Sequence, residues 1–278
     1  MQQLLWVRWL DTLRTNNEWS VVYCKAVQDD GSLLFPERLT KDFLDRARRT
    51  MGSYIFANQY QNEIIPSGEQ TFQKHWLKYF VELPDELLTF CFVDPAISEA
   101  DTADYTGFIV VSTDVNQNWY VRYASRQKIN PSQIIEHCFK INEQFKPAII
   151  GIEDVAFQRS VVHFAYEEMK RRGKQIPLTG VKRGTDKTKD MRILSLVPRF
   201  EWGSLFIAQG LHDLELELAQ FPRGAHDDLI DSLASINDIA YYPQKPRSRN
   251  ANPQPNDPGY EAWYIKTKLG NARKYTDD

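Results

Sequence analysis

Cysteine is scarce in this chain of 278 residues, which has only Cys24, Cys91 and Cys138. The three are odd in number and widely spaced, and they form neither a CxxC pair nor a Cys/His spacing typical of zinc. This pattern argues against a disulfide framework and against a structural zinc site. It favours a reduced, intracellular protein.

Long hydrophobic runs are also missing. Residues 1–10 are partly apolar, but Arg8 interrupts them, Asp11 follows, and no small-residue cleavage site comes after. A helix that crosses a bilayer needs about 20 predominantly apolar residues. We therefore expect neither a signal peptide nor a membrane span.

The phosphate-binding loop of motor ATPases, GxxxxGK[ST], is absent as well. The Gly173-Lys174 pair is followed by Gln175 and so does not complete that motif. ATP hydrolysis by this chain alone is therefore not expected. An excess of basic charge is missing too, because 34 Lys and Arg face 37 Asp and Glu, for a net charge of −3. Any surface for nucleic acid must therefore be local.

What the sequence does contain is a change of pattern near residue 85. Residues 1–84 are mainly helical with scattered aromatics, and residues 243–278 form a proline-rich linker and tail. Between them, residues 85–242 begin with three hairpin-like strands and continue with alternating helices and strands. This order predicts an α/β domain with a mixed sheet flanked by helices. The expected strands cover 18–27, 88–93, 108–112, 119–124, 148–152, 176–181 and 205–208; the expected helices cover 130–145, 158–172, 185–200, 211–221 and 225–241.

Acids stand where this pattern predicts the ends of elements. Asp94 ends the first strand of the domain, Glu153 ends the fourth, and Asp227 and Asp228 open the last helix. Each has an ordinary alternative, since Asp-Pro is a common turn and acids often cap helices. The carboxyl ends of adjacent strands, however, define the ligand crevice of an open α/β sheet.

Carboxylates that converge repel one another unless protons or cations bridge them. Oxygen-only ligands select hard ions, so two Mg²⁺ or Mn²⁺ ions are the expected cofactors. Two such ions suit the hydrolysis of a phosphodiester. Successive helical residues diverge by about 100°, so Asp227 and Asp228 can bind different ions, or only one of them faces the site.

The stretches DPA, DYTG, GIEDVAFQ and HDDLIDSLA together resemble the nuclease domain of the large terminase subunit of tailed phages, over roughly residues 85–242. The stretches DGSLLFPERLT and MGSYIFANQYQNEIIP resemble the join between a terminase motor domain and its nuclease. The resemblance implies a ribonuclease-H-like fold, related to Holliday-junction resolvases. It implies cleavage of concatemeric viral DNA during genome packaging, by two-metal hydrolysis in the host cell cytoplasm.

The resemblance also implies roles for particular residues. Asp94, Glu153 and Asp227 or Asp228 would be the metal ligands and catalytic acids, and Asp104 matches an additional acid of the family. Asp231 ranks lower. Candidates for DNA contact are Lys182, Arg183, Lys187, Arg192 and His226. The implied partners are double-stranded DNA, the small terminase subunit, the portal protein and an ATPase part that this chain lacks.

Basic charge is indeed concentrated near these candidates, since residues 170–199 hold ten Lys or Arg and two acids. Such a strip would attract phosphate toward acids that repel it. The alternative is a solvated helix face without a ligand. Trp263 and Tyr264 in the tail have two interpretations as well, partner docking or folding back onto the domain.

Two other functions fit parts of the pattern. A junction resolvase would prefer branched DNA and act as a dimer. A non-catalytic docking module of the packaging motor would retain the carboxylates as remnants and would bind no divalent ion.

Overall fold

The computed structural model describes residues 24–63, 71–95, 105–153, 158–182 and 188–244, together with residues 20, 22, 260 and 264; at 158–162 it describes the backbone alone. Its contacts divide the chain into two units, Met1–Pro243 and Gln244–Asp278. The domain boundary expected at residues 84–85 stays a prediction. Among the described residues, no helix combines the length and the apolar character needed to cross a membrane.

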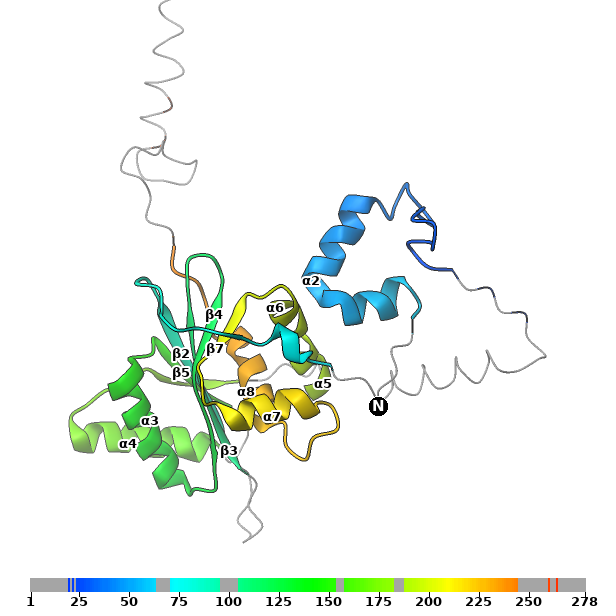
Figure 1. The fold of residues 1–278 in the computed structure, drawn as a ribbon. Helices are drawn as coiled ribbons and strands as arrows, with labels where there is room; N and C mark the ends of the chain where they lie inside the picture. The colour runs from blue at the N-terminus through cyan, green and yellow to red at the C-terminus, as the bar shows by residue number, and fades with distance from the viewer. Residues whose placement is uncertain are drawn as a thin grey trace, which may run out of the picture. The chain divides into compact units, whose positions relative to one another are not determined.

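The strands of the described residues form one seven-stranded sheet, in the order β1-β7-β4-β3-β2-β5-β6 (Figure 1). Their bounds are Lys78–Tyr79 for β1, Leu88–Asp94 for β2, Thr106–Thr113 for β3, Trp119–Gln127 for β4, Ile149–Glu153 for β5, Leu178–Val181 for β6 and Leu205–Ile207 for β7. Strands β2, β3 and β4 pair antiparallel, while β5 and β6 continue parallel to β2 and β7 pairs parallel to β4. The predicted mixed α/β sheet is confirmed.

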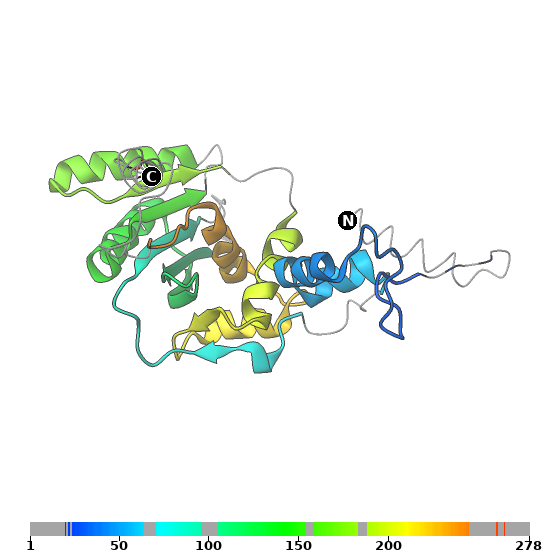
Figure 2. The ribbon, with the colours of Figure 1, turned by 90° about the horizontal axis from the view of Figure 1, so that it is seen from above.

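Helices cover both faces of this sheet. Their bounds are Lys41–Tyr60 for α2, Pro131–Phe145 for α3, Gln158–Arg172 for α4, Lys189–Leu194 for α5, Val197–Glu201 for α6, His212–Gln220 for α7 and Asp228–Ser235 for α8, with 3₁₀ turns at Lys74–Trp76 and Ile236–Asp238. Figure 2 shows α3 and α4, in green, on one side of the strands, and α7 and α8, in yellow and orange, on the other. All eight residues of β3 are buried, as expected of a strand covered on both faces.

Alternation along β2 separates two cores. Phe90 and Phe92 point into the cluster that contains α5, α6, α7 and α8. Cys91 and Val93 point into the cluster beneath α3 and α4. Because side chains alternate between faces, each position at the strand end can be assigned to one of these two sides.

Three predicted elements differ from the structure. The helix expected over 185–200 is two helices in its described part, because Pro198 has no N–H to continue α5 and instead sits in the first turn of α6. The helix expected over 225–241 begins only at Asp228, since Asp227 has φ −146° and ψ 17°, and it becomes 3₁₀ at Ile236. In the described part of the strand expected over 18–27, an isolated bridge from Val27 to Leu33 replaces the strand.

The described part of the N-terminal segment contains one α-helix, α2, which bends sharply at Gly52, where φ is +79°. A Cβ at this position would lie 3.3 Å from side-chain atoms of both Val197 and Pro198. The next residue, Ser53, donates its backbone N–H to Glu201 at 2.9 Å. Glycine therefore meets two demands here, a left-handed backbone and a close approach to α6.

Candidate functional site

Asp94 and Glu153 end two neighbouring parallel strands. Val93 is the register partner of Ile152, so the two acids occupy the next position along β2 and β5. Asp94 follows the alternation of Phe90 and Phe92, and Glu153 follows that of Ile149, which packs against the same core cluster. Both acids are half-buried. The two predicted acids therefore lie on the same face of the sheet, the face that α8 covers.

Gly107 lets α8 come close to Asp94. It is the register partner of Asp94 on β3. A Cβ on Gly107 would lie 2.9 Å from Ser232 Oγ and 3.4 Å from the backbone oxygen of Asp228. A larger residue would thus push the first turns of α8 away from the sheet. Because glycine has no side chain, the start of α8 can lie next to the end of β2.

Asp228 is the first residue of α8 and is half-buried. Burial raises the pKa of its carboxyl; the Lys189 ammonium lowers it, and the charges of Asp227 and Asp94 raise it again, for a net increase. Asp94 of β2 and Asp228 of α8 therefore interact electrostatically, although 134 positions separate them in the sequence. A divalent cation bound between these carboxylates would relieve their mutual repulsion.

Lys189 at the start of α5 contacts the two acids at the start of α8. Its Nζ lies 2.7 Å from Asp227 Oδ1 and 3.8 Å from Asp228 Oδ1. Burial lowers the pKa of Lys189, but the hydrogen bond to Asp227 and the charges of Asp227, Asp231 and Asp228 outweigh burial and raise it. Lys189 therefore remains charged and neutralises part of the acidic cluster.

Within the described residues, the acids form a donor set but not a preassembled metal centre. In the described part of the chain, no three His, Cys, Asp or Glu side chains are grouped closely enough to hold a metal ion. The donor chemistry nevertheless fits a hard divalent ion, because the side chains are carboxylates. Burial, together with the charges of Asp227 and Asp94, raises the pKa of Asp228. Ion binding at this place would require the lysine to move aside and the carboxylates to close in. Asp104 lies outside the described residues.

Glu217 of α7 is a functional candidate that the sequence reasoning missed. Its side chain is 2% exposed, and its Oε2 accepts the backbone N–H groups of Leu229 at 2.9 Å and Ile230 at 3.2 Å. Burial raises its pKa to about 7, although the two backbone N–H groups lower it, Asp228 raises it and Arg126 lowers it. A sequence signal existed, because Leu214, Glu217 and Leu218 share the helical spacing of one buried face.

Arg192, a predicted DNA contact, lies against α8. Its guanidinium contacts both carboxylate oxygens of Asp231 at 3.0 Å, and the two side chains are 16% and 1% exposed. This bidentate pair fixes α5 to α8 and explains the acid at 231. Its role as a phosphate contact stays a prediction.

The other predicted DNA contacts are in different situations. Lys182 is exposed just after β6, whereas Arg183 and Lys187 lie outside the described residues. His226 is 41% exposed; its Nδ1 lies 4.0 Å from Asp228 Oδ2, and its ring meets the edge of Tyr105 at 5.3 Å between centroids. His226 therefore lies beside Asp228, and its contact with DNA stays a prediction.

The basic strip is not one continuous surface. Lys170, Arg171 and Arg172 form ion pairs with acids of α3 and α4, and Lys174 pairs with Glu143. These pairs belong to the face of the sheet opposite the acids. In this part of the strip, the solvated helix face considered above describes the structure better than a phosphate surface.

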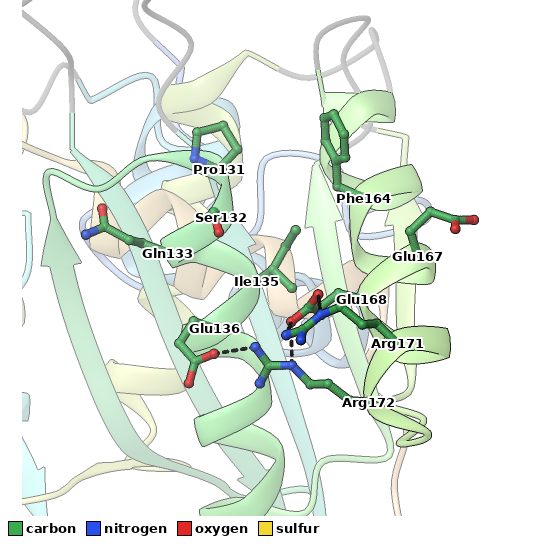
Figure 3. A pocket seen from close by; sticks show the side chains of 10 residues that line it. All are labelled: Pro131, Ser132, Gln133, Ile135, Glu136, Phe164, Glu167, Glu168, Arg171 and Arg172. Carbon is green, nitrogen blue, oxygen red and sulfur yellow. Dashed lines mark hydrogen bonds and ion pairs between the residues drawn. The ribbon is translucent and has the colours of Figure 1, made fainter.

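A cleft of about 770 Å³ also lies on that opposite face, between α3 and α4 (Figure 3). Phe164 and Ile135 line it together with Glu168, Arg171 and Arg172, which are bound to one another and to Glu136. The cleft is separated from Asp94 and Glu153 by the sheet. It is therefore not part of the candidate site.

No protein-family model and no curated protein matches this chain. Its structure is similar to that of the large terminase from a thermophilic bacteriophage, solved in several crystal forms. Crystal form 3 of that protein matches with a TM-score of 0.53 and 11% identity, over 72% of this chain and 53% of the other. Crystal form 2 matches with a TM-score of 0.52 and 11% identity, over 71% and 51%. The chain thus spans about half the length of these structures. The predicted resemblance to a large terminase is confirmed at the level of the fold.

Proposed function

We propose that this chain is a metal-dependent DNA endonuclease that cuts concatemeric viral DNA during genome packaging. The observation that carries the proposal is the placement of Asp94 and Glu153 side by side at the ends of β2 and β5, on the face covered by α8. The electrostatic influence of Asp94 on Asp228 adds the third acid. The shared fold with a large terminase supports the packaging role.

Asp94, Glu153 and Asp228 are the residues proposed to hold two divalent ions, Mg²⁺ or Mn²⁺, with Asp227 and Asp104 as further ligands. Ions bound there would supply activation of the attacking water and neutralisation of charge on the leaving oxygen. The chain's own residues hold the acids in place. The sheet fixes Asp94 and Glu153, and the cap from Glu217 fixes the first turn of α8.

Lys189 has a role of its own in this proposal. It neutralises Asp227 and part of the charge of Asp228 when no divalent ion is bound. It therefore limits the repulsion that would otherwise destabilise the fold around the start of α8. We expect its ammonium to leave Asp227 when ions bind and to become available to the phosphate backbone.

The proposed substrate is double-stranded DNA, and the proposed partners are the small terminase subunit, the portal protein and an ATPase part absent from the given residues. The setting would be the host cell cytoplasm. The proposal that the ATPase part lies outside the given residues rests on the missing GxxxxGK[ST] motif.

Plasmid nicking tests the proposal. Supercoiled plasmid is incubated with the protein in Mg²⁺, Mn²⁺, Ca²⁺ or chelator, and Asp94→Asn and Glu153→Gln are compared with the control Asp238→Asn, which changes an exposed acid of the 3₁₀ turn after α8. We expect nicking in Mg²⁺ or Mn²⁺ by wild type and control alone. Equal nicking by all four proteins would contradict the proposal. A strong preference for a four-way junction over linear DNA would favour a resolvase instead.

A further inference from the structure

Strands β2, β4, β5 and β6 are among those that run in the same direction, so their carboxyl ends lie at one edge of the sheet. Strands β2, β5 and β6 are parallel, and β4 has the same direction because it pairs antiparallel with β3, which pairs antiparallel with β2. Across this edge the order is β6, β5, β2, β3, β4. Lys182 follows β6, Glu153 ends β5, Asp94 ends β2, and Lys128 follows β4. The acids therefore have one lysine on each side.

Lys128 belongs to the same face as the acids. Thr106 is the register partner of Gln127, so Tyr105 stands opposite Lys128 at the next position. The Lys128 Nζ lies 5.0 Å from the centroid of the Tyr105 ring. The same ring contacts His226, which immediately precedes Asp227 and Asp228. Lys128 is thus linked through one aromatic ring to the start of α8.

The neighbouring Arg126 has other contacts. Its guanidinium lies 5.3 Å from the centroid of the Tyr105 ring and pairs with buried Glu217 at 3.4 Å and with Asp213 at 3.8 Å. Lys128, by contrast, is exposed, and among the residues that the structure describes no carboxylate comes within ion-pair distance of it. Since an exposed cation–π contact is weak, Tyr105 can orient the Lys128 side chain without withholding its charge from a phosphate.

We propose that Lys128 is a DNA-backbone contact, and that the cleaved strand crosses the sheet edge from Lys182 on the β6 side to Lys128 on the β4 side, over Glu153 and Asp94. This inference rests on the proposed function. Four strand spacings separate β6 from β4, which is about 19 Å at the usual spacing of neighbouring strands.

The salt dependence of DNA binding tests the proposal. Affinity for a linear duplex is measured by fluorescence anisotropy over a range of salt concentrations in chelator, so that cleavage does not interfere. The variant is Lys128→Ala, and the matched control is Lys140→Ala, which removes an exposed lysine of α3 on the opposite face of the sheet. Thermal unfolding of each protein checks that the fold is retained.

A lost phosphate contact makes the slope of log K against log salt shallower by about 0.9. We expect this change for Lys128→Ala, about twice this change for the double variant with Lys182→Ala, and no change for Lys140→Ala. Equal slopes for Lys128→Ala and Lys140→Ala would overturn the inference. If the slopes changed as expected while Asp94→Asn still nicked plasmid like wild type, the DNA path would stand and the nuclease assignment would fail.

Discussion

The carboxylate of Glu217 accepts the backbone N–H of Leu229 at 2.9 Å, although the two residues belong to different helices. Helix N-termini are ordinarily capped by the side chain of the N-cap residue itself. In α8 that residue is Asp227, and its side chain makes no capping hydrogen bond. Because α7 supplies the cap, the carboxylates of Asp227 and Asp228 are left for Lys189 and, as proposed, for divalent ions.

The buried cap predicts a pH dependence of stability. The pKa of Glu217 is about 7 in the folded chain against an ordinary value of 4.5, so folding favours the protonated form. Its contribution to stability is therefore fully present below about pH 4.5 and is lost as the pH rises through about 7. Relative to Glu217→Gln, which cannot ionise, the wild type should lose as much as roughly 3 kcal/mol of unfolding free energy across this range.

Urea unfolding of both proteins at several pH values between 4.5 and 8 measures this difference. Asp213→Asn, which changes an exposed carboxylate of the same helix, is the control and should follow the wild type. A wild-type curve parallel to that of Glu217→Gln would show that Glu217 has an ordinary pKa in the folded chain.

The close approach of α8 to β3 predicts a pair of substitutions with opposite effects. Gly107→Ala places a Cβ 2.9 Å from Ser232 Oγ, an overpacking expected to cost about 1–3 kcal/mol and to weaken ion binding by shifting Asp228. Within the described residues Ser232 Oγ is buried without a hydrogen-bond partner, so Ser232→Ala alone should be neutral or stabilising.

The double variant Gly107→Ala with Ser232→Ala removes the closest contact and should recover most of the loss. Urea unfolding and calorimetric titration with Mn²⁺ report the two effects separately. If the double variant were no better than Gly107→Ala, the clash at Ser232 would not be what limits the position of α8.

The contacts of Lys189 predict that its ammonium group competes with a divalent ion for Asp227 and Asp228. In Lys189→Met, Asp227 loses a hydrogen bond of 2.7 Å and Asp228 loses a nearby positive charge. The melting temperature in chelator should fall, and the affinity for Mn²⁺ should rise several-fold, because no ammonium needs to be displaced. Lys174→Met breaks an ion pair on the opposite face and should leave the Mn²⁺ affinity unchanged. An affinity unaltered or weakened in Lys189→Met would argue against competition.

Elements and their ends were largely predictable from the sequence because their signals are local. Hydrophobic runs that end in Asp94 and Glu153 define two strands, and Asn130 followed by Pro131 marks the start of α3, where the structure shows a capping box with Gln133. The fold class and the proximity of the acids follow from such local signals together with the rules of open sheets.

Long-range pairings could not be predicted in this way. Nothing near Arg192 in the sequence indicates its buried partner Asp231, which lies 39 positions away, and its contact with DNA stays a prediction. The cap from Glu217 and the pairing of Lys189 with Asp227 likewise depend on how α5, α7 and α8 pack together. Charge counts along the chain therefore overstated the basic surface, since several of its members are neutralised by acids from other elements.

Titration with Mn²⁺ tests the central claim most directly. Calorimetric titration measures whether acids from β2 and β5 bind the same ions. The proteins compared are wild type, Asp94→Asn, Glu153→Gln and Asp238→Asn, each confirmed as folded by its melting curve. We expect binding by wild type and Asp238→Asn, and a loss of at least about tenfold in affinity for each of the other two, since each removes a charged ligand. Undiminished Mn²⁺ binding by both Asp94→Asn and Glu153→Gln would contradict the account.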